Sequence, residues 1–400
     1  MTETTRTTSG LLRRMSSRSP DEGHRAATPL ELFFDLCFVV AVAQAGVRLV
    51  HAVAEGHFAS GILGYTLVFF AIWWAWMNFT WFASAYDNDD VFYRIAVLVQ
   101  IAGVLVLAAG VPRAFDDGNW TVAILGYVVM RLAMTCQWLR VARHNEGPER
   151  SMALKYAVGL VIVQLGWLAV LITPDAARPY VFAVLALAEL SVPPIAERRF
   201  ETSWHPHHIA ERYGLFTIIV LGESITAATI AVQEGLDEHD ELGELLSIAG
   251  GGLLIVFCAW WIYFANPAQE RLTSMKRAIQ WGYGHLFILG SAAAIGAGIE
   301  VAVEHVVGKA HISAVAATAA VTIPTALFLF TGWFLQARHF KRDLAEKALM
   351  PVTVVVVLAC TFLGTWGVLA AGLAMALTVT IGTLLAARPE SDTLRTPRLS

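Results

Sequence analysis

The feature that most constrains this chain is a set of long stretches without any charge. Residues 60–85 and 350–387 each lack a charged side chain, and only 15% of all residues are charged, against roughly a quarter in a soluble domain. A bilayer accommodates such stretches because one span needs about 20 predominantly apolar residues. Backbone groups in hydrocarbon must pair within their own segment, and the alternating strands of a barrel are not evident. The sequence therefore predicts an all-α fold, a polytopic integral membrane helix bundle.

Polar breaks between the apolar stretches predict about twelve spans. Residues 350–387 would form a helix of about 57 Å, far longer than one span, so a tight hairpin near Gly364 and Gly367 is expected. The predicted spans lie near 30–50, 60–85, 94–111, 121–139, 153–173, 179–197, 210–232, 245–265, 279–303, 312–336, 350–367 and 369–387.

The distribution of Lys and Arg orients these spans. With the N-terminus inside, the predicted outer loops hold only Arg48, Arg113, Arg178 and Lys309. Basic residues concentrate in cytoplasmic loops of membrane proteins, so both termini are predicted to be cytoplasmic. The predicted inner loops hold Arg140, Arg143, Arg150, Lys155, Arg198, Arg199, Arg212, Arg271, Lys276, Arg277, Arg338, Lys341, Arg342 and Lys347.

The two ends of the chain differ from the membrane domain between them, residues 30–387. Residues 1–29 are rich in Arg, Ser and Thr and lack the apolar core of a signal peptide. We expect this segment to be a disordered cytoplasmic tail, and residues 388–400 to be a second cytoplasmic tail.

A weak internal repeat divides the membrane domain into residues 30–197 and 198–387. Glu31 opens the first span and Glu211 the seventh, and paired tryptophans recur in the second and eighth spans. Two sets of six spans would share one orientation, as in parallel-repeat transporters. The alternative is that tryptophan pairs fall near membrane interfaces by chance.

Three ionisable residues fall near the middle of predicted spans: Arg131, Glu189 and Glu223. Each costs about 2.5–3.5 kcal/mol at a helix centre. Because Arg131 cannot lose its charge, it needs a partner anion, and Glu189 and Glu223 are the central carboxylates available. Such a pair either fixes helix packing or belongs to a polar path.

Polar residues also gather at the start of the first and seventh spans. Glu31 and Asp35 are four residues apart, on one side of their helix. At roughly 100° per residue, His208, Glu211, Arg212 and Glu223 fall within about a third of the circumference of the seventh. We therefore predict a substrate or ion path whose residues are Glu31, Asp35, Glu211, Arg212, Glu223 and Ser224.

Three histidines, His205, His207 and His208, precede and open the seventh span. His208 and Glu211 have a spacing that a zinc ion can use, but a pH-sensitive interfacial cluster or a helix cap is the favoured interpretation. The four cysteines are far apart and form no CxxC motif. Walker, GxSxG and HExxH motifs are absent. No cofactor or nucleic-acid partner is predicted, only membrane lipids and an unknown small solute or ion.

Two stretches resemble the signatures of the bacterial low-temperature-requirement A (LtrA) family, and the resemblance covers about residues 25–387. The first is Pro29-Leu30-Glu31-Leu32-Phe33-Phe34-Asp35-Leu36-Cys37-Phe38-Val39, in which Cys37 replaces the expected valine. The second runs from His208-Ile209-Ala210-Glu211-Arg212-Tyr213-Gly214 to Leu221-Gly222-Glu223-Ser224. The resemblance implies a multi-span protein of the bacterial plasma membrane, named for growth at low temperature, with a poorly defined activity. It also implies that Glu31, Asp35, His208, Glu211, Arg212 and Glu223 are motif residues.

A looser similarity connects the chain to cation channels with two six-span repeats and a Phe-Ser-Asp motif. Phe34-Asp35 corresponds to that motif, whereas Phe216-Thr217 in the seventh span lacks the Asp. We therefore predict a transporter or channel-like permease for a small solute or ion. A membrane-embedded enzyme acting on a lipid and a non-catalytic membrane adaptation factor are the alternatives.

Overall fold

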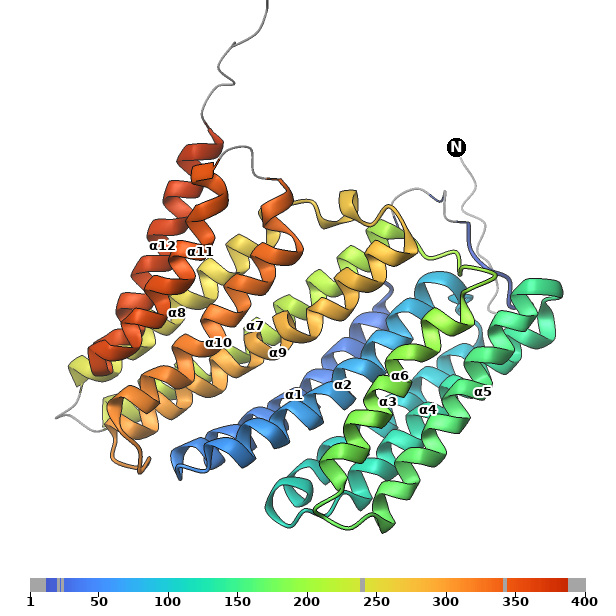
Figure 1. Ribbon diagram of the computed structural model, residues 1–400, viewed down its shortest axis with the longest axis horizontal. Coiled ribbons are helices and arrows are strands. Elements are labelled where there is room, and N and C mark those ends of the chain that lie inside the picture. Colours follow the sequence, from blue (N-terminus) through green and yellow to red (C-terminus); the bar gives the residue numbers. More distant parts are fainter. Residues whose placement is uncertain (1–11, 20–21, 23–24, 238–241, 341–343, 388–400) are drawn as a thin grey trace, which may run out of the picture.

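The structure, a computed structural model, describes residues 12–19, 22, 25–237, 242–340 and 344–387, which form helices and connections without a strand (Figure 1). Short 3₁₀ segments follow several helices, among them η5, Thr361–Trp366. The α-helices are α1 Pro29–Ala54, α2 Phe58–Tyr86, α3 Val91–Asp116, α4 Thr121–His144, α5 Gly147–Ala169, α6 Arg178–Ala196, α7 Pro206–Asp237, α8 Leu242–Phe264, α9 Met275–Val306, α10 Ala314–Leu335, α11 Leu344–Cys360 and α12 Gly367–Ala386.

Ten helical segments of the described residues are long and apolar enough to cross a bilayer. This confirms the all-α class and the many membrane-spanning helices. The ten include α1 to α6 and α8 to α10, and the segment Leu344–Ala386 counts as one; α7 is not among them. The expected number of twelve spans therefore stays a prediction.

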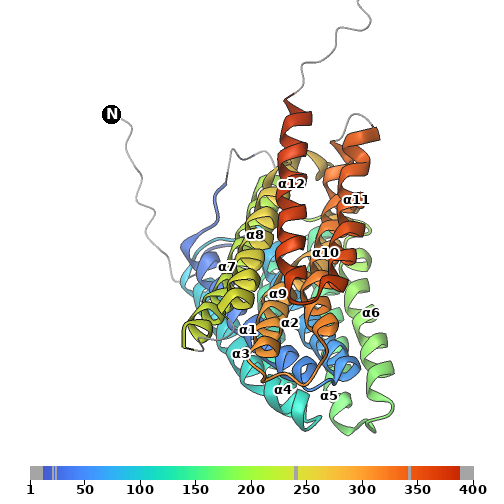
Figure 2. The same ribbon diagram turned by 90° about the vertical axis from the view of Figure 1, so that its left-hand side faces the viewer.

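The segment Leu344–Ala386 bends sharply inside η5. Gly364 has φ 60° and ψ −144°, a backbone conformation that glycine adopts without steric cost. Thr318 of α10 donates a hydrogen bond of 2.8 Å to the carbonyl oxygen of Gly364. As a result α11 and α12 lie side by side (Figures 1 and 2), as the glycines in the sequence led us to expect.

The helices fall into two groups, α1 to α6 and α7 to α12, which meet where α1 and α2 contact α7 and α9 (Figure 1). Within the first group α1 contacts α2 and α3, and α3–α4, α4–α5 and α5–α6 are neighbours. Within the second group α7 contacts α8 and α9, and α9–α10, α10–α11 and α11–α12 are neighbours. These neighbour pairs therefore follow the same order along the chain in both groups.

Small residues allow the closest of these contacts. A Cβ atom at Gly126 of α4 would collide with the backbone of α3 at Leu107. Likewise, a Cβ atom at Gly251 of α8 would collide with the backbone of α12 at Val368. Close backbone approach replaces the hydrophobic driving force that is missing between helices in lipid.

Part of the segment before α1 lies across the end of the bundle at which α1 begins. We call residues 12–19, 22 and 25–28 the N-terminal strap. The Arg18 N–H donates to Ala85 O at 2.9 Å, Asn145 Nδ2 donates to Met15 O at 2.8 Å, and the Met15 side chain is fully buried. The sequence-based expectation for this region was a disordered tail; residues 1–11 and 388–400 lie outside the described residues.

Candidate functional site

The first turn of α1 fixes the position of Glu31. Thr28 caps the helix, because its Oγ1 accepts a hydrogen bond of 3.3 Å from the Glu31 N–H. Glu31 Oε2 in turn accepts one of 2.7 Å from the Thr28 N–H. This reciprocal capping box occupies one carboxylate oxygen of Glu31 and leaves the other, Oε1, for contacts with α7.

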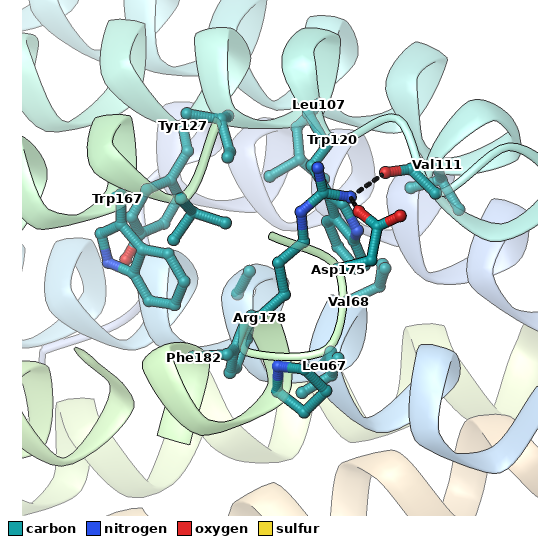
Figure 3. A pocket seen from close by; sticks show the side chains of 16 residues that line it. Leu67, Val68, Leu107, Val111, Trp120, Tyr127, Trp167, Asp175, Arg178 and Phe182 are labelled. Carbon is teal, nitrogen blue, oxygen red and sulfur yellow. Dashed lines mark hydrogen bonds and ion pairs between the residues drawn. The ribbon is translucent and has the colours of Figure 1, made fainter. Parts of the chain in front are cut away.

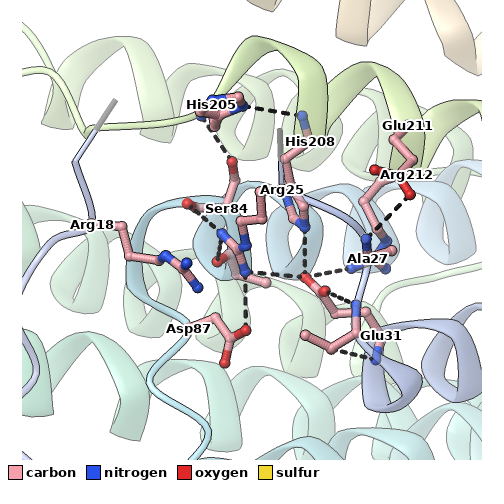
Figure 4. Close-up of polar contacts among 12 residues, drawn as sticks. Arg18, Arg25, Ala27, Glu31, Ser84, Asp87, His205, His208, Glu211 and Arg212 are labelled. Carbon is pink, nitrogen blue, oxygen red and sulfur yellow. Dashed lines mark hydrogen bonds and ion pairs between the residues drawn. The ribbon is translucent and has the colours of Figure 1, made fainter. Parts of the chain in front are cut away.

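Two side chains of α7 meet that second oxygen. His208 Nε2 lies 3.1 Å from Glu31 Oε1, and Arg212 Nη1 lies 3.0 Å from it. Residues four apart on a helix are neighbours on its surface, so His208 and Arg212 approach Glu31 together (Figure 4). The sequence analysis placed Glu31 and Arg212 in one predicted path and His208 in a separate histidine cluster, whereas the structure brings the three side chains together.

Arg212 also binds the second carboxylate of α1. Its Nη2 donates to Asp35 Oδ1 at 2.5 Å, and its Nε donates to Asp35 Oδ2 at 3.2 Å. Trp76 Nε1 of α2 donates to Asp35 Oδ1 at 2.7 Å. Glu31, Asp35, His208 and Arg212 are all 0% exposed, so Arg212 joins two carboxylates in a site shut off from solvent.

The N-terminal strap covers this site. Arg25 donates to the carbonyl oxygens of Ala83 and Ser84 at the end of α2, and its Nη2 lies 3.0 Å from Asp87 Oδ2 and 3.8 Å from Glu31 Oε1 (Figure 4). Burial and the nearby Glu31 carboxylate raise the pKa of Asp87, against the opposing effect of Arg25.

Together these residues form what we call the ionic cluster: Glu31, Asp35, Asp87, Arg25, His208 and Arg212. Three carboxylates face two guanidinium groups and one imidazole, so the formal charge is −1 when His208 is neutral and zero when it is protonated. His208 Nδ1 is buried and has no hydrogen-bond partner among the described residues. A neutral imidazole that carries its hydrogen on Nε2, 3.1 Å from Glu31 Oε1, leaves Nδ1 as the atom that can accept a proton.

A second buried network surrounds Glu189 in α6. This carboxylate, 1% exposed, accepts hydrogen bonds from Tyr127 (2.9 Å) and Trp167 (3.1 Å) at Oε1. Trp74 donates to Oε2 at 2.6 Å, and Arg131 forms an ion pair with the same oxygen. We call these five residues the Glu189 network. The carboxylate has four donors, from α2, α4 and α5, so the network binds four helices together and leaves Glu189 little capacity for a substrate.

Glu223 and Ser224 lie outside both networks. The Glu223 side chain is exposed, whereas His208 and Arg212 on the same helix are buried. Ser224 is buried and donates to Ala292 O of α9 at 3.2 Å. At 1.5 Å per residue Glu223 is about 16 Å along the axis from Arg212, where the face that carries it is no longer covered. The structure therefore does not bring Glu223 to the ionic cluster, and its place in a path along α7 stays a prediction.

The remaining sequence candidates lie beside the ionic cluster. Glu211 is half-buried and accepts a hydrogen bond of 3.2 Å from the Ala27 N–H of the strap. The His205 N–H donates to Ser84 Oγ at 3.0 Å, and its Nε2 lies 2.9 Å from Glu22 O, while His207 is exposed. Among the described residues no group of three or more His, Cys, Asp or Glu side chains is placed to hold a metal ion.

Sequence reasoning missed Arg25, Trp76 and Asp87 as partners in the cluster. Arg25 lies in a segment whose composition is typical of disorder, and Trp76 belongs to the tryptophan-rich part of the second span, which was interpreted only as part of a repeat or as interface residues. A signal for Asp87 was present in the sequence. The predicted inner loop that contains Asp87, Asp89 and Asp90 is acidic, and acidic residues near Arg-rich segments are expected to form ion pairs.

The comparison with known families identifies the kind of protein that carries this site. Residues 26–387 match the model of the family described as "Bacterial low temperature requirement A protein (LtrA)". The chain belongs to this family. It is also similar to an uncharacterized protein of Rhizobium meliloti (strain 1021), with 25% identity over 292 residues, 69% of each chain. The LtrA match contains most of the ionic cluster and begins one residue after Arg25.

Proposed function

We propose that this LtrA-family protein is a multi-pass permease of the bacterial cytoplasmic membrane for a small ion or solute. The ionic cluster is its binding site. The observation that carries the proposal is the complete burial of four ionisable side chains between α1 and α7, where the two groups of helices meet. Ionisable groups inside membrane bundles are costly, and they mark ion and substrate paths when they do not simply pair.

The contrast between the two buried networks supports this assignment. Glu189 is saturated by four donors, as expected of a packing device. The ionic cluster instead has unequal numbers of acids and guanidinium groups, and a histidine decides its net charge. A site that changes by one charge unit on protonation can exchange a proton or another monovalent cation as the helices around it move.

The same proposal includes the finer topology: twelve spans in two sets of six, with both termini in the cytoplasm. The shared neighbour pairs in the two groups of helices support a parallel repeat. The bend at Gly364 supports separate α11 and α12 spans. The excess of Lys and Arg in the loops at the α1-start end supports a cytoplasmic location for the ionic cluster.

Cysteine labelling in intact cells tests this topology. We expect cysteines introduced at Asp117 and Leu363 to react with a membrane-impermeant reagent from outside, and a cysteine at Arg143 to react only after permeabilisation. All three side chains are exposed. A variant without Cys136, which is also exposed, provides the background. Reaction at Arg143 but not at Leu363 in intact cells would contradict the topology.

Ion-driven currents test the permease proposal. Purified protein in liposomes on a solid-supported membrane should give transient currents on concentration jumps of H⁺, Na⁺ or K⁺. We expect His208→Gln to reduce the current at least about tenfold, because the loss of one interaction worth about 1.4 kcal/mol changes an equilibrium by that factor. The variant should also flatten the dependence of the current on pH.

His207→Gln is the matched control, because His207 is the exposed neighbour of His208 and should keep the wild-type current. Equal currents in the two variants would contradict a role for the ionic cluster. No ion-dependent current in any protein, together with normal folding, would favour the alternatives of a lipid-directed enzyme or an adaptation factor without turnover.

A further inference from the structure

A cavity lies inside the first group of helices, at the end opposite the ionic cluster. It has a volume of about 320 Å³, opens at one side, and is lined by residues of α2 to α6 and of the connections between them (Figure 3). Its walls are apolar and aromatic, and include Val68, Leu107, Ile124, Trp167 and Phe182. This composition is typical of sites that take the apolar part of a small molecule.

One basic side chain stands at the mouth of this cavity. Arg178 Nη1 donates to Gly118 O at 2.8 Å and lies 2.7 Å from Asp175 Oδ1. Figure 3 shows the Arg178 side chain reaching across the cavity mouth toward Trp120. Asp175 is 88% exposed, so solvent weakens its hold on Arg178, and another carboxylate can take its place.

The volume limits the size of the occupant. An apolar cavity of about 150 Å³ accepts one benzene molecule. A cavity of about 320 Å³ therefore has room for about a dozen carbon atoms. Arg178 Nε also donates to Thr173 O at 3.2 Å, so a carboxylate that replaces Asp175 would bind the Nη groups through charge-assisted hydrogen bonds.

We propose that this cavity binds a single-chain carboxylic acid of about a dozen carbons, with the chain between α2 and α6 and the carboxylate on Arg178. The site is independent of the proposed ion path. A second cavity, of about 420 Å³, lies between α1–α2 and α9–α10, and no charged side chain lines it among the described residues. It offers an acid no comparable anchor.

Photolabelling of the full-length protein with a diazirine analogue of dodecanoic acid tests this site. We expect the label on peptides that contain residues 118–127 and 175–182. Arg178→Gln should weaken the apparent affinity about tenfold or more, the usual effect of losing a charge-assisted hydrogen bond. Ala71→Phe, which places a ring in the cavity, should abolish the labelling there.

Two controls match these variants. Arg113→Gln removes an exposed arginine at the same end of the bundle, and Ala43→Phe enlarges a half-buried alanine that lines neither cavity. Both should be labelled like the wild type. If Ala71→Phe fails to accumulate, Arg178→Gln, at a partly exposed position, still decides the question.

Three results would overturn the proposal. The first is equal labelling by the analogue of dodecanol, which lacks the acid group. The second is a label on residues of the second cavity or spread over the lipid-facing surface. The third is that a two-chain anionic phospholipid prevents the labelling at the same concentration at which dodecanoate prevents it. A site for a single chain should bind such a phospholipid much more weakly.

Discussion

Replacing Glu189 with Gln is expected to lower the free energy of unfolding by about 3–5 kcal/mol, because removal of one partner strands the other charge in the interior. Arg131 is 2% exposed, and its Nε and Nη1 already lack hydrogen-bond partners among the described residues. The ion pair with Glu189 is therefore its main compensation. The loss should be measured by denaturant unfolding of the detergent-purified protein.

Glu223→Gln is the matched control for this prediction. Glu223 is an exposed carboxylate, and its replacement should change stability by no more than about 0.5 kcal/mol. The double variant Arg131→Met with Glu189→Gln should recover part of the loss, since no charge is then stranded. A large loss for Glu223→Gln and a small one for Glu189→Gln would reverse the assignment of the partner.

The sequence predicted the class of fold because that conclusion depends on composition. Long stretches without charge admit few structures other than helices in a bilayer. It also predicted that Arg131 needs a carboxylate, with Glu189 and Glu223 as candidates. The choice between them depends on how α4, α6 and α7 are rotated against one another, and one sequence does not contain that information.

The position of Glu223 shows where an argument from helix faces ends. The angular positions of His208, Arg212 and Glu223 follow from the period of the helix. The period does not determine which neighbouring helices cover that face at each depth. Near Arg212 α7 is packed against α1 and the N-terminal strap, whereas Glu223, about three turns later on the same face, is exposed.

The N-terminal strap could not be predicted because its order depends on tertiary contacts. The segment has the Ser, Thr and Arg content typical of disorder. Arg25 is nonetheless buried by the carbonyl groups at the end of α2 and by Asp87. Its partners lie about 60 residues away in sequence, beyond the reach of local patterns.

Replacing Arg212 with Gln should be the most damaging single change in the ionic cluster. Arg212 is fully buried and binds Glu31 and Asp35 at once, so its loss strands two carboxylates. We expect a loss of at least about 3–5 kcal/mol and poor accumulation in the membrane, measured by fluorescence-detected size-exclusion chromatography. Arg198→Gln, at an exposed position in the connection between α6 and α7, should accumulate normally.

Adding Asp35→Asn to Arg212→Gln should restore much of the accumulation. The single variant carries a formal cluster charge of −2 with neutral His208, and the double variant returns this to the wild-type value of −1. Trp76 Nε1 can still donate to the amide oxygen of Asn at position 35, as it does to Asp35. If the double variant is no better than the single one, net charge does not explain the requirement for Arg212. Arg212→Lys is an independent test of charge against geometry, because it keeps the charge but loses the planar fork that reaches both carboxylates. Accumulation near that of the wild type would assign the effect to charge, whereas failure would assign it to the fork.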